Sequence, residues 1–280
     1  MPFATFNGFD TWYEIHGDGP ALLLIPGRGL DRTSWQPQLG CYSPHFRTIV
    51  YDPRGVGKTR AESGAFGVQD MAADAEALLH SLDIEQAHIA GFSLGGMAAI
   101  HLAARKRVQV TSLSLHSTVH RAYPHLRWRQ RLSLHILKLD DAELWAQFSA
   151  YTAFGAEFIN ANEAVANAEV ERRIKRWQGM DAEAKEGVAS QIRAAMTHDA
   201  DDLLPLIGAP TLVTVGSSDE ATRPEYANDL ASRIPGARLV TFPGAPHRVS
   251  TFAADEFNRV TLDFLLEHRQ GSDRERSNLQ

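Results

Sequence analysis

Two kinds of apolar pattern alternate along the chain. Short runs rich in apolar residues, several of them closed by glycine or proline, are typical of buried parallel strands and occupy 21–25, 47–51, 87–92, 110–116, 211–215 and 238–242. Segments in which apolar residues recur three and four positions apart predict helices at 68–82, 97–105, 224–233 and 253–268. Because strands and helices take turns, we predict an α/β fold with a mostly parallel central sheet flanked by helices.

The first residues follow a different pattern. Asn7 and Gly8 form a turn dipeptide between two strand-like segments, Thr5–Phe6 and Thr11–Ile15. Asn-Gly is a strong signal for a tight two-residue turn, so we expect an antiparallel hairpin here.

The interval 119–205 breaks the alternation. It holds long helical stretches rich in alanine and glutamate, and no strong strand candidate. Its aromatic residues include Trp128, Trp145, Phe148, Tyr151, Phe154, Phe158 and Trp177. We predict that 119–205 is a helical cap over one end of the sheet, inserted into a core domain formed by 1–118 and 206–270. An independent helical domain is the alternative, and 271–280 is expected to be a disordered, solvated tail.

Composition narrows the class of protein. The 280 residues are 44% hydrophobic and 22% charged, which is ordinary for a globular protein. With 28 basic and 34 acidic residues the formal net charge is −6, which argues against a general nucleic-acid binder. The single cysteine, Cys41, excludes an internal disulfide and a cysteine-rich zinc site. We interpret it as a small packed residue.

No segment suggests export or membrane insertion. Residues 1–10 lack a basic stretch followed by an apolar run, and the longest dense apolar runs, 21–26 and 94–104, are too short to span a bilayer. We therefore expect a cytoplasmic protein that acts on a small-molecule substrate, without a membrane or nucleic-acid partner. A homodimer is a possible assembly, although no feature of the sequence marks an interface.

The sharpest chemical signal is the segment GFSLGG at 91–96. It places Ser93 between Gly91 and Gly95, after a predicted strand and before a predicted helix. Small flanking residues permit a tight, strained turn that exposes a nucleophilic hydroxyl above the sheet. The start of the following helix also presents free N–H groups toward developing negative charge. We therefore interpret Ser93 as a nucleophile.

A serine nucleophile needs a base to take its proton. Among the twelve histidines, most lie inside helix or strand patterns, where a surface or packing role is expected. His247 instead follows the last predicted strand, at the sheet edge where parallel-sheet enzymes build their sites. His198 is the rival, but it lies at the end of the inserted region, away from any strand end.

The base in turn needs an acid that fixes its tautomer and stabilises the imidazolium. Asp219 follows the predicted strand 211–215, again at a carboxyl end, and the adjacent Glu220 is the fallback. The other position suited to an acid, after the strand that ends near His116, contains no carboxylate in 117–119. Asp219 is therefore the predicted acid.

The chain order Ser93, Asp219, His247 is the order found in α/β-hydrolases. With it, the chain resembles the α/β-hydrolase fold superfamily, in a serine-esterase-like form with a helical cap, over about residues 5–270. The segments that carry the resemblance are GFSLGG at 91–96, DPRGVGKT at 52–59, APTLVTVGSSD at 209–219 and PGAPH at 243–247. The resemblance implies the fold predicted above and a catalytic triad.

One loop departs from the family pattern. The loop after the first buried parallel strand commonly begins His-Gly in the family, whereas here Pro26 stands in place of the histidine. The resemblance implies that the backbone N–H groups of Arg28 and Leu94 form the oxyanion hole. Backbone donation does not depend on the side chain, so the hole can survive the change. The Arg28 side chain is either solvated or reaches into the pocket, where it would favour a carboxylate- or carbonyl-bearing substrate.

The segment DPRGVGKT also ends in Gly-Lys-Thr, the last part of a phosphate-binding loop. The full motif G-x-x-x-x-G-K-[ST] requires glycine at position 52, where this chain has Asp52. We interpret the segment as a tight structural loop near the catalytic edge.

Together these residues predict a serine hydrolase that works through an acyl-enzyme and requires no metal or organic cofactor. We expect it to cleave a carboxylic ester or lactone of a small to mid-sized, partly apolar substrate. The same triad supports a C–C bond hydrolase, a thioesterase, an amidase or a cofactor-free peroxidase, because fold does not determine the reaction. Outside enzymes, the alternative is a low-turnover ligand-binding receptor on a hydrolase fold.

Overall fold

A single mixed sheet forms the centre of the protein. A computed structural model describes residues 3–60 and 65–269, and within them eight strands pair in the order β1-β2-β4-β3-β5-β6-β7-β8. The strands are β1 (Phe3–Phe6), β2 (Phe9–His16), β3 (Ala21–Ile25), β4 (Arg47–Tyr51), β5 (Gln86–Phe92), β6 (Gln109–His116), β7 (Thr211–Gly216) and β8 (Arg238–Phe242). All pairs from β4 to β8 are parallel, so the prediction of a mostly parallel sheet is confirmed.

The predicted hairpin begins the chain. β1 and β2 pair antiparallel with Phe6 opposite Phe9, and β2 continues antiparallel along β4. Asn7 and Gly8 both have positive φ, 53° and 85°, as a two-residue type I′ turn requires.

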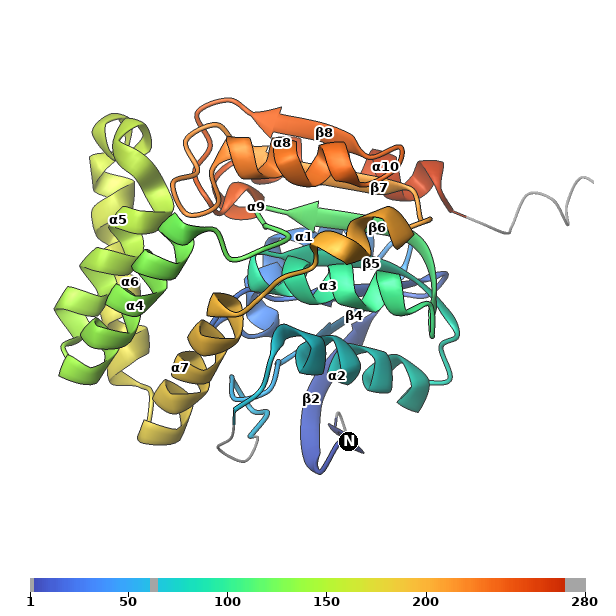
Figure 1. Cartoon of the computed structure of the whole chain (residues 1–280), viewed down its shortest axis with the longest axis horizontal. Coiled ribbons are helices and arrows are strands. Elements are labelled where there is room, and N and C mark those ends of the chain that lie inside the picture. Colours follow the sequence, from blue (N-terminus) through green and yellow to red (C-terminus); the bar gives the residue numbers. More distant parts are fainter. Residues whose placement is uncertain (1–2, 61–64, 270–280) are drawn as a thin grey trace, which may run out of the picture.

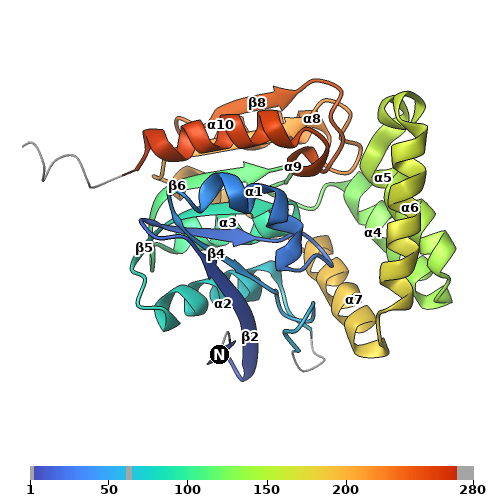
Figure 2. The same ribbon diagram turned by 180° about the vertical axis from the view of Figure 1, so that it is seen from behind.

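Helices cover both faces of the sheet (Figures 1 and 2). The core helices are α1 (Gln36–Tyr42), α2 (Val68–Ser81), α3 (Leu94–Arg105), α8 (Pro224–Arg233), α9 (Val249–Phe252) and α10 (Ala254–Glu267), with the 3-10 helix η1 (Arg32–Trp35). The sequence patterns did not predict η1 and α1. The short helix α9 was not predicted either, whereas the predicted helix 253–268 corresponds to α10.

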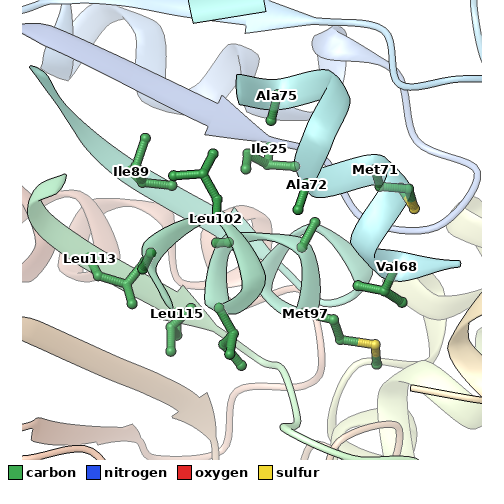
Figure 3. Close-up of a cluster of buried hydrophobic side chains, with 14 of the residues drawn as sticks. Ile25, Val68, Met71, Ala72, Ala75, Ile89, Met97, Leu102, Leu113 and Leu115 are labelled. Carbon is green, nitrogen blue, oxygen red and sulfur yellow. The ribbon is translucent and has the colours of Figure 1, made fainter. Parts of the chain in front are cut away.

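Successive residues of β3 show why its run of apolar residues is continuous. Leu23 and Ile25 pack under α2 and α3, in the cluster drawn in Figure 3, whereas Leu22 and Leu24 pack on the opposite face. Side chains alternate between the faces of a strand, so a strand covered on both sides must be apolar at every position.

The interval between β6 and β7 is helical. It contains α4 (Pro124–Leu139), α5 (Ala142–Ala161), α6 (Glu163–Gln178) and α7 (Ala182–Met196), followed by the 3-10 helix η2 (Asp201–Leu206). Figure 1 shows α4 to α7 gathered beyond one end of the sheet. The domain boundaries at 118/119 and 205/206 stay a prediction.

Three expectations from the sequence, on the tail, the cellular location and the assembly, stay predictions. The predicted disordered tail, 271–280, lies outside the described residues. Over residues 3–60 and 65–269, no helix combines the length and apolar character needed to cross a membrane. The cytoplasmic location and the homodimer stay predictions.

Candidate active site

Ser93 lies at the sharp turn between the end of β5 and the start of α3. Its φ of 53° and ψ of −116° are a strained backbone conformation for a residue with a side chain. Two hydrogen bonds hold the turn against the next strand and its loop: the Ser93 N–H donates to the His116 carbonyl at 2.9 Å, and the Thr118 hydroxyl donates to the Ser93 carbonyl at 2.6 Å.

The glycines beside Ser93 are required by close backbone packing. A Cβ at Gly95 would overlap the carbonyl oxygens of Ile25 and Pro26, and a Cβ at Gly91 would overlap the carbonyl of Gly95. The motif therefore lets β3, β5 and α3 approach closely enough to form the turn.

Ser93, His247 and Asp219 lie together at the carboxyl edge of the sheet. His247 Nε2 is 3.2 Å from Ser93 Oγ, and His247 Nδ1 is 2.9 Å from Asp219 Oδ2. The backbone N–H of His247 donates to the carbonyl of Ala153 in α5 at 2.9 Å. The structure thus brings the three predicted residues together, and the inserted helices help to hold the histidine.

The Asp219 carboxylate is buried and fully engaged. Its Oδ1 accepts from the backbone N–H groups of Ala221 at 2.8 Å and Thr222 at 2.7 Å. Its Oδ2 accepts from the Thr222 hydroxyl at 2.9 Å as well as meeting His247. The fallback Glu220 instead pairs with Arg223 at 2.7 Å on the surface. The geometry therefore favours Asp219 over Glu220 as the partner of His247.

The rival histidine lies in a different environment. His198 Nδ1 is 3.4 Å from His101 Nε2, and burial lowers the pKa of His198 to about 3. Among the described residues, the histidine that hydrogen-bonds to Ser93 Oγ is His247.

The loop after β3 and the first residue of α3 line a cavity together with Ser93. Gly29 N–H donates to the Gln191 side-chain oxygen of α7 at 2.7 Å, and Leu30 N–H donates to the Gly27 carbonyl at 3.1 Å. Arg28, which precedes Gly29, has a backbone N–H with no acceptor within the part of the chain that the structure describes, and the same is true of Leu94 N–H. Both predicted oxyanion donors are therefore available to a ligand.

The loop 52–59 is stabilised by contacts of its own side chains. The buried Asp52 carboxylate accepts from Lys58 N–H at 2.8 Å and pairs with Arg32 at 3.1 Å. The Lys58 ammonium lies 3.7 Å from the ring centre of Trp12. Asp52 thus stabilises the turn at the position where a phosphate loop needs glycine.

A cavity of about 360 Å³ opens above Ser93, within the usual range for small-molecule sites. Ser93 and His247 line it, together with apolar side chains of the insertion such as Trp145. The Arg28 side chain also lines it, and its Nη1 donates to the Gln130 side-chain oxygen. Of the two positions considered for this side chain, the structure shows the one inside the pocket. Burial lowers its pKa to about 9, helped by the charges of Arg129 and Arg173.

Across residues 3–60 and 65–269, no group of three or more His, Cys, Asp or Glu side chains is placed to hold a metal ion.

Several residues of the site were missed by reading the sequence. Thr222 has a weak signal, because a hydroxyl three residues after a loop aspartate often closes a local turn. Arg172, Arg173 and Arg176 are spaced to share one helix face. Gln191 has no signal, because its contact with Gly29 depends on how α7 packs against a loop distant in sequence.

The chain is similar in sequence to known proteins. The family model described as "alpha/beta hydrolase fold" matches residues 20–253. A protein of Caulobacter sp. (strain K31) named as a carbamate hydrolase, RutD, is 30% identical, over 95% of this chain and 98% of its own. The protein of the same name from Azorhizobium caulinodans is 29% identical over 94% of this chain and 98% of its own.

Solved structures of other proteins are also similar to this chain. The enol-lactonase from Burkholderia xenovorans LB400 is 29% identical, with a TM-score of 0.80 over 95% of this chain and all of its own. MGS-M2, an α/β hydrolase from a deep-sea metagenome library, has a TM-score of 0.90 at 20% identity and covers 97% of this chain and 99% of its own, a likeness of fold alone.

Proposed function

The chain belongs to the α/β-hydrolase fold family, and from that premise we propose that it is a serine hydrolase that cleaves a carboxylic ester or lactone through an acyl-enzyme. The observation that carries the proposal is the unbroken contact from Ser93 Oγ through both ring nitrogens of His247 to the buried Asp219. This chain of contacts opens into the cavity at its serine end.

The first half of the proposed reaction forms the acyl-enzyme. His247 Nε2 accepts the Ser93 proton as Oγ attacks the substrate carbonyl, and Asp219 stabilises the resulting imidazolium. The N–H groups of Arg28 and Leu94 donate to the oxyanion. As the tetrahedral intermediate collapses, the imidazolium gives its proton to the leaving oxygen.

The second half releases the acid. His247 takes a proton from water, which attacks the acyl carbonyl, and the same two N–H groups bind the second oxyanion. Collapse returns the proton to Ser93 Oγ and frees the carboxylic acid. Every atom in this cycle comes from the substrate, water or the three side chains, so the cycle requires no cofactor.

Hydrolysis of 4-nitrophenyl esters of increasing acyl length tests the proposal. We expect turnover by the wild type and a loss of roughly a millionfold in kcat for Ser93→Ala. Equal rates for the two proteins would exclude Ser93 as the nucleophile. Tight binding of an ester without release of acid or alcohol would instead favour a receptor.

A second candidate is cleavage of a carbamate, favoured by the names of the relatives that cover nearly the whole chain. The carbamate carbonyl would be attacked by the same serine. A higher kcat/KM for 4-nitrophenyl carbamate than for 4-nitrophenyl acetate would favour this function over ester hydrolysis.

A further inference from the structure

Guanidinium groups dominate the charge of the cavity above Ser93. The arginines that line it are Arg28, Arg129, Arg172, Arg173, Arg176 and Arg248. Among the described lining residues, Glu169 supplies the carboxylate that faces them. The whole chain has a formal net charge of −6, so this positive cavity is a local feature and not a reflection of composition.

Burial makes these charges costly. Arg28, Arg129, Arg173 and Arg248 are half-buried, and burial is the main cause that lowers the pKa of each guanidinium, to about 9 for Arg28 and about 10 for Arg248. A desolvated charge destabilises the fold unless an opposite charge pairs with it. A set of such groups around one cavity therefore indicates that an anion belongs there.

Glu169 neutralises only one side of the cluster. Its carboxylate lies 2.7 Å from Arg172, 3.2 Å from Arg173 and 3.6 Å from Arg248. Those three guanidinium groups share a single negative charge.

Arg28 and Arg129 have neutral acceptors instead. Arg28 donates to the Gln130 amide, and Arg129 donates to the Ala221 carbonyl at 2.6 Å. In the described part of the chain neither forms an ion pair with a carboxylate, and the charges that act on Arg28 are those of Arg129 and Arg173, both positive. The charge of the nearby Asp219 carboxylate partly stabilises the Arg129 guanidinium, so Arg28 has the greatest need of an external anion.

We propose that the substrate is an anionic ester or lactone whose carboxylate is bound by Arg28 together with Arg129. This inference rests on the proposed function, because it names the substrate class of the same serine hydrolase. The guanidinium fork matches the two oxygens of a carboxylate, and such charge-assisted pairs are strong where water is excluded. Arg28 then serves twice: its backbone N–H faces the reacting carbonyl, and its side chain binds the remote carboxylate.

Apolar residues of the same cavity suit the rest of such a molecule. Met97, Leu126, Trp145 and Trp177 line the cavity together with the arginines. They can contact a short carbon chain between the scissile carbonyl and the carboxylate.

Matched esters that differ only in a terminal carboxylate test the inference. For the acyl side, 4-nitrophenyl glutarate is compared with 4-nitrophenyl pentanoate; for the alcohol side, 5-acetoxypentanoate is compared with pentyl acetate. Spontaneous hydrolysis is subtracted in each case. We expect kcat/KM to be roughly 10- to 100-fold higher for the carboxylate member of at least one pair. Lack of a preference in both pairs overturns the inference.

An arginine variant then identifies the group responsible. Arg28→Met keeps the backbone N–H and removes the guanidinium. In the pair that shows a preference, we therefore expect the ratio of kcat/KM for the carboxylate ester to kcat/KM for the neutral ester to fall at least tenfold. Arg259→Met is the matched control, because Arg259 is exposed on α10 and weakly paired with Asp263 at 3.9 Å. An unchanged ratio in Arg28→Met would show that Arg28 does not bind the carboxylate.

Failure of this inference can be separated from failure of the proposed function. Neutral esters hydrolysed by the wild type and not by Ser93→Ala, with no preference for the anionic members, would retain the hydrolase and reject the anionic substrate. Neutral and anionic esters cleaved equally well by Ser93→Ala and the wild type would reject both.

Discussion

The edge of the sheet and the inserted helices contribute different chemistry to one cavity. The proposed reacting groups come from the edge, where Ser93 follows β5, Asp219 follows β7 and His247 follows β8. Most of the charge around the substrate space comes from the insertion, with Arg129 on α4 and Arg172, Arg173 and Arg176 on α6. Arg28 and Arg248, from loops at the edge, join the two sets.

The two regions are held in place by different forces. Parallel backbone pairing in register aligns the strand ends, so the loops that follow them meet at a defined place. The inserted helices are positioned by side-chain packing, as in the cluster of Ala150, Phe154, Phe158 and Ala166. In the proposed function the sheet edge supplies the reacting groups, while the insertion and the edge loops that carry Arg28 and Arg248 together line the substrate space.

Loss of the acid at the sheet edge is expected to lower activity more than any change in the insertion. Asp219→Asn preserves shape but removes the charge that fixes the His247 tautomer, so we expect kcat to fall by roughly ten-thousandfold. Steady-state kinetics on 4-nitrophenyl acetate measure it. Glu220→Gln, one residue along the loop and exposed, is the control and should retain activity. Comparable losses in the two variants would contradict the assignment of Asp219.

Adding a methyl group is expected to lower the free energy of unfolding at the sheet edge but not in the insertion. Gly95→Ala would force Cβ against the Ile25 carbonyl, and we expect a loss of roughly 3 kcal/mol in the free energy of unfolding. Gly179, after α6 in the insertion, has only ordinary contacts, the nearest at 3.5 Å, so Gly179→Ala should be close to neutral. Urea denaturation of both variants makes the comparison. Equal stabilities would show that the turn at Ser93 is less tightly constrained than its packing indicates.

The same contrast explains how much of the molecule the sequence could predict. Ser93, Asp219 and His247 were found because each follows an apolar strand, and strand ends in a parallel sheet meet at one edge. Leu22 to Ile25 are all apolar because both faces of β3 are buried, and such a continuous apolar run can be recognised in the sequence. Local patterns therefore predicted the sheet and the three residues brought together at its edge.

Residues of the cavity wall could not be placed in that way. The arginines of α6 are consistent with an ordinary solvated helix face until the path of the insertion is known. The short helix α1 was missed because its seven residues hold only a few apolar side chains and carry no long periodicity. Contacts between segments distant in sequence, such as Gly29 with Gln191, depend on packing that no local pattern encodes.

Acid sensitivity should distinguish the buried sheet from the insertion surface. Burial lowers the pKa of His116, on β6, to about 3, whereas an unfolded histidine binds its proton near pH 6.5. The unfolded chain therefore binds more protons below that pH, and stability falls as the pH drops from about 6.5 toward 3. We expect the loss between pH 7 and pH 5 to be about 2 kcal/mol smaller in His116→Gln than in the wild type.

Urea denaturation at both pH values measures this difference. Burial also lowers the pKa values of His88, His101 and His198. These histidines remain in both proteins, so their contributions to the pH dependence cancel in the comparison. His135, exposed on α4, provides the control: His135→Gln should lose as much stability as the wild type. An identical pH dependence in His116→Gln and the wild type would contradict the assignment of acid sensitivity to His116.

The smallest expected effect tests whether the insertion also helps to position the loop of the proposed oxyanion hole. Gln191, on α7 of the insertion, is buried and accepts from Gly29 N–H at 2.7 Å, next to the Arg28 N–H of the proposed oxyanion hole. Gln191→Leu removes this anchor and frees the loop, so we expect kcat for 4-nitrophenyl acetate to fall roughly tenfold, less than the loss of a donor itself. KM should change little, because Gln191 does not line the cavity. Gln147→Leu, an exposed change on α5, is the matched control. If kcat is retained while stability falls, the insertion shapes the substrate space only, and the sheet edge positions its oxyanion loop without help.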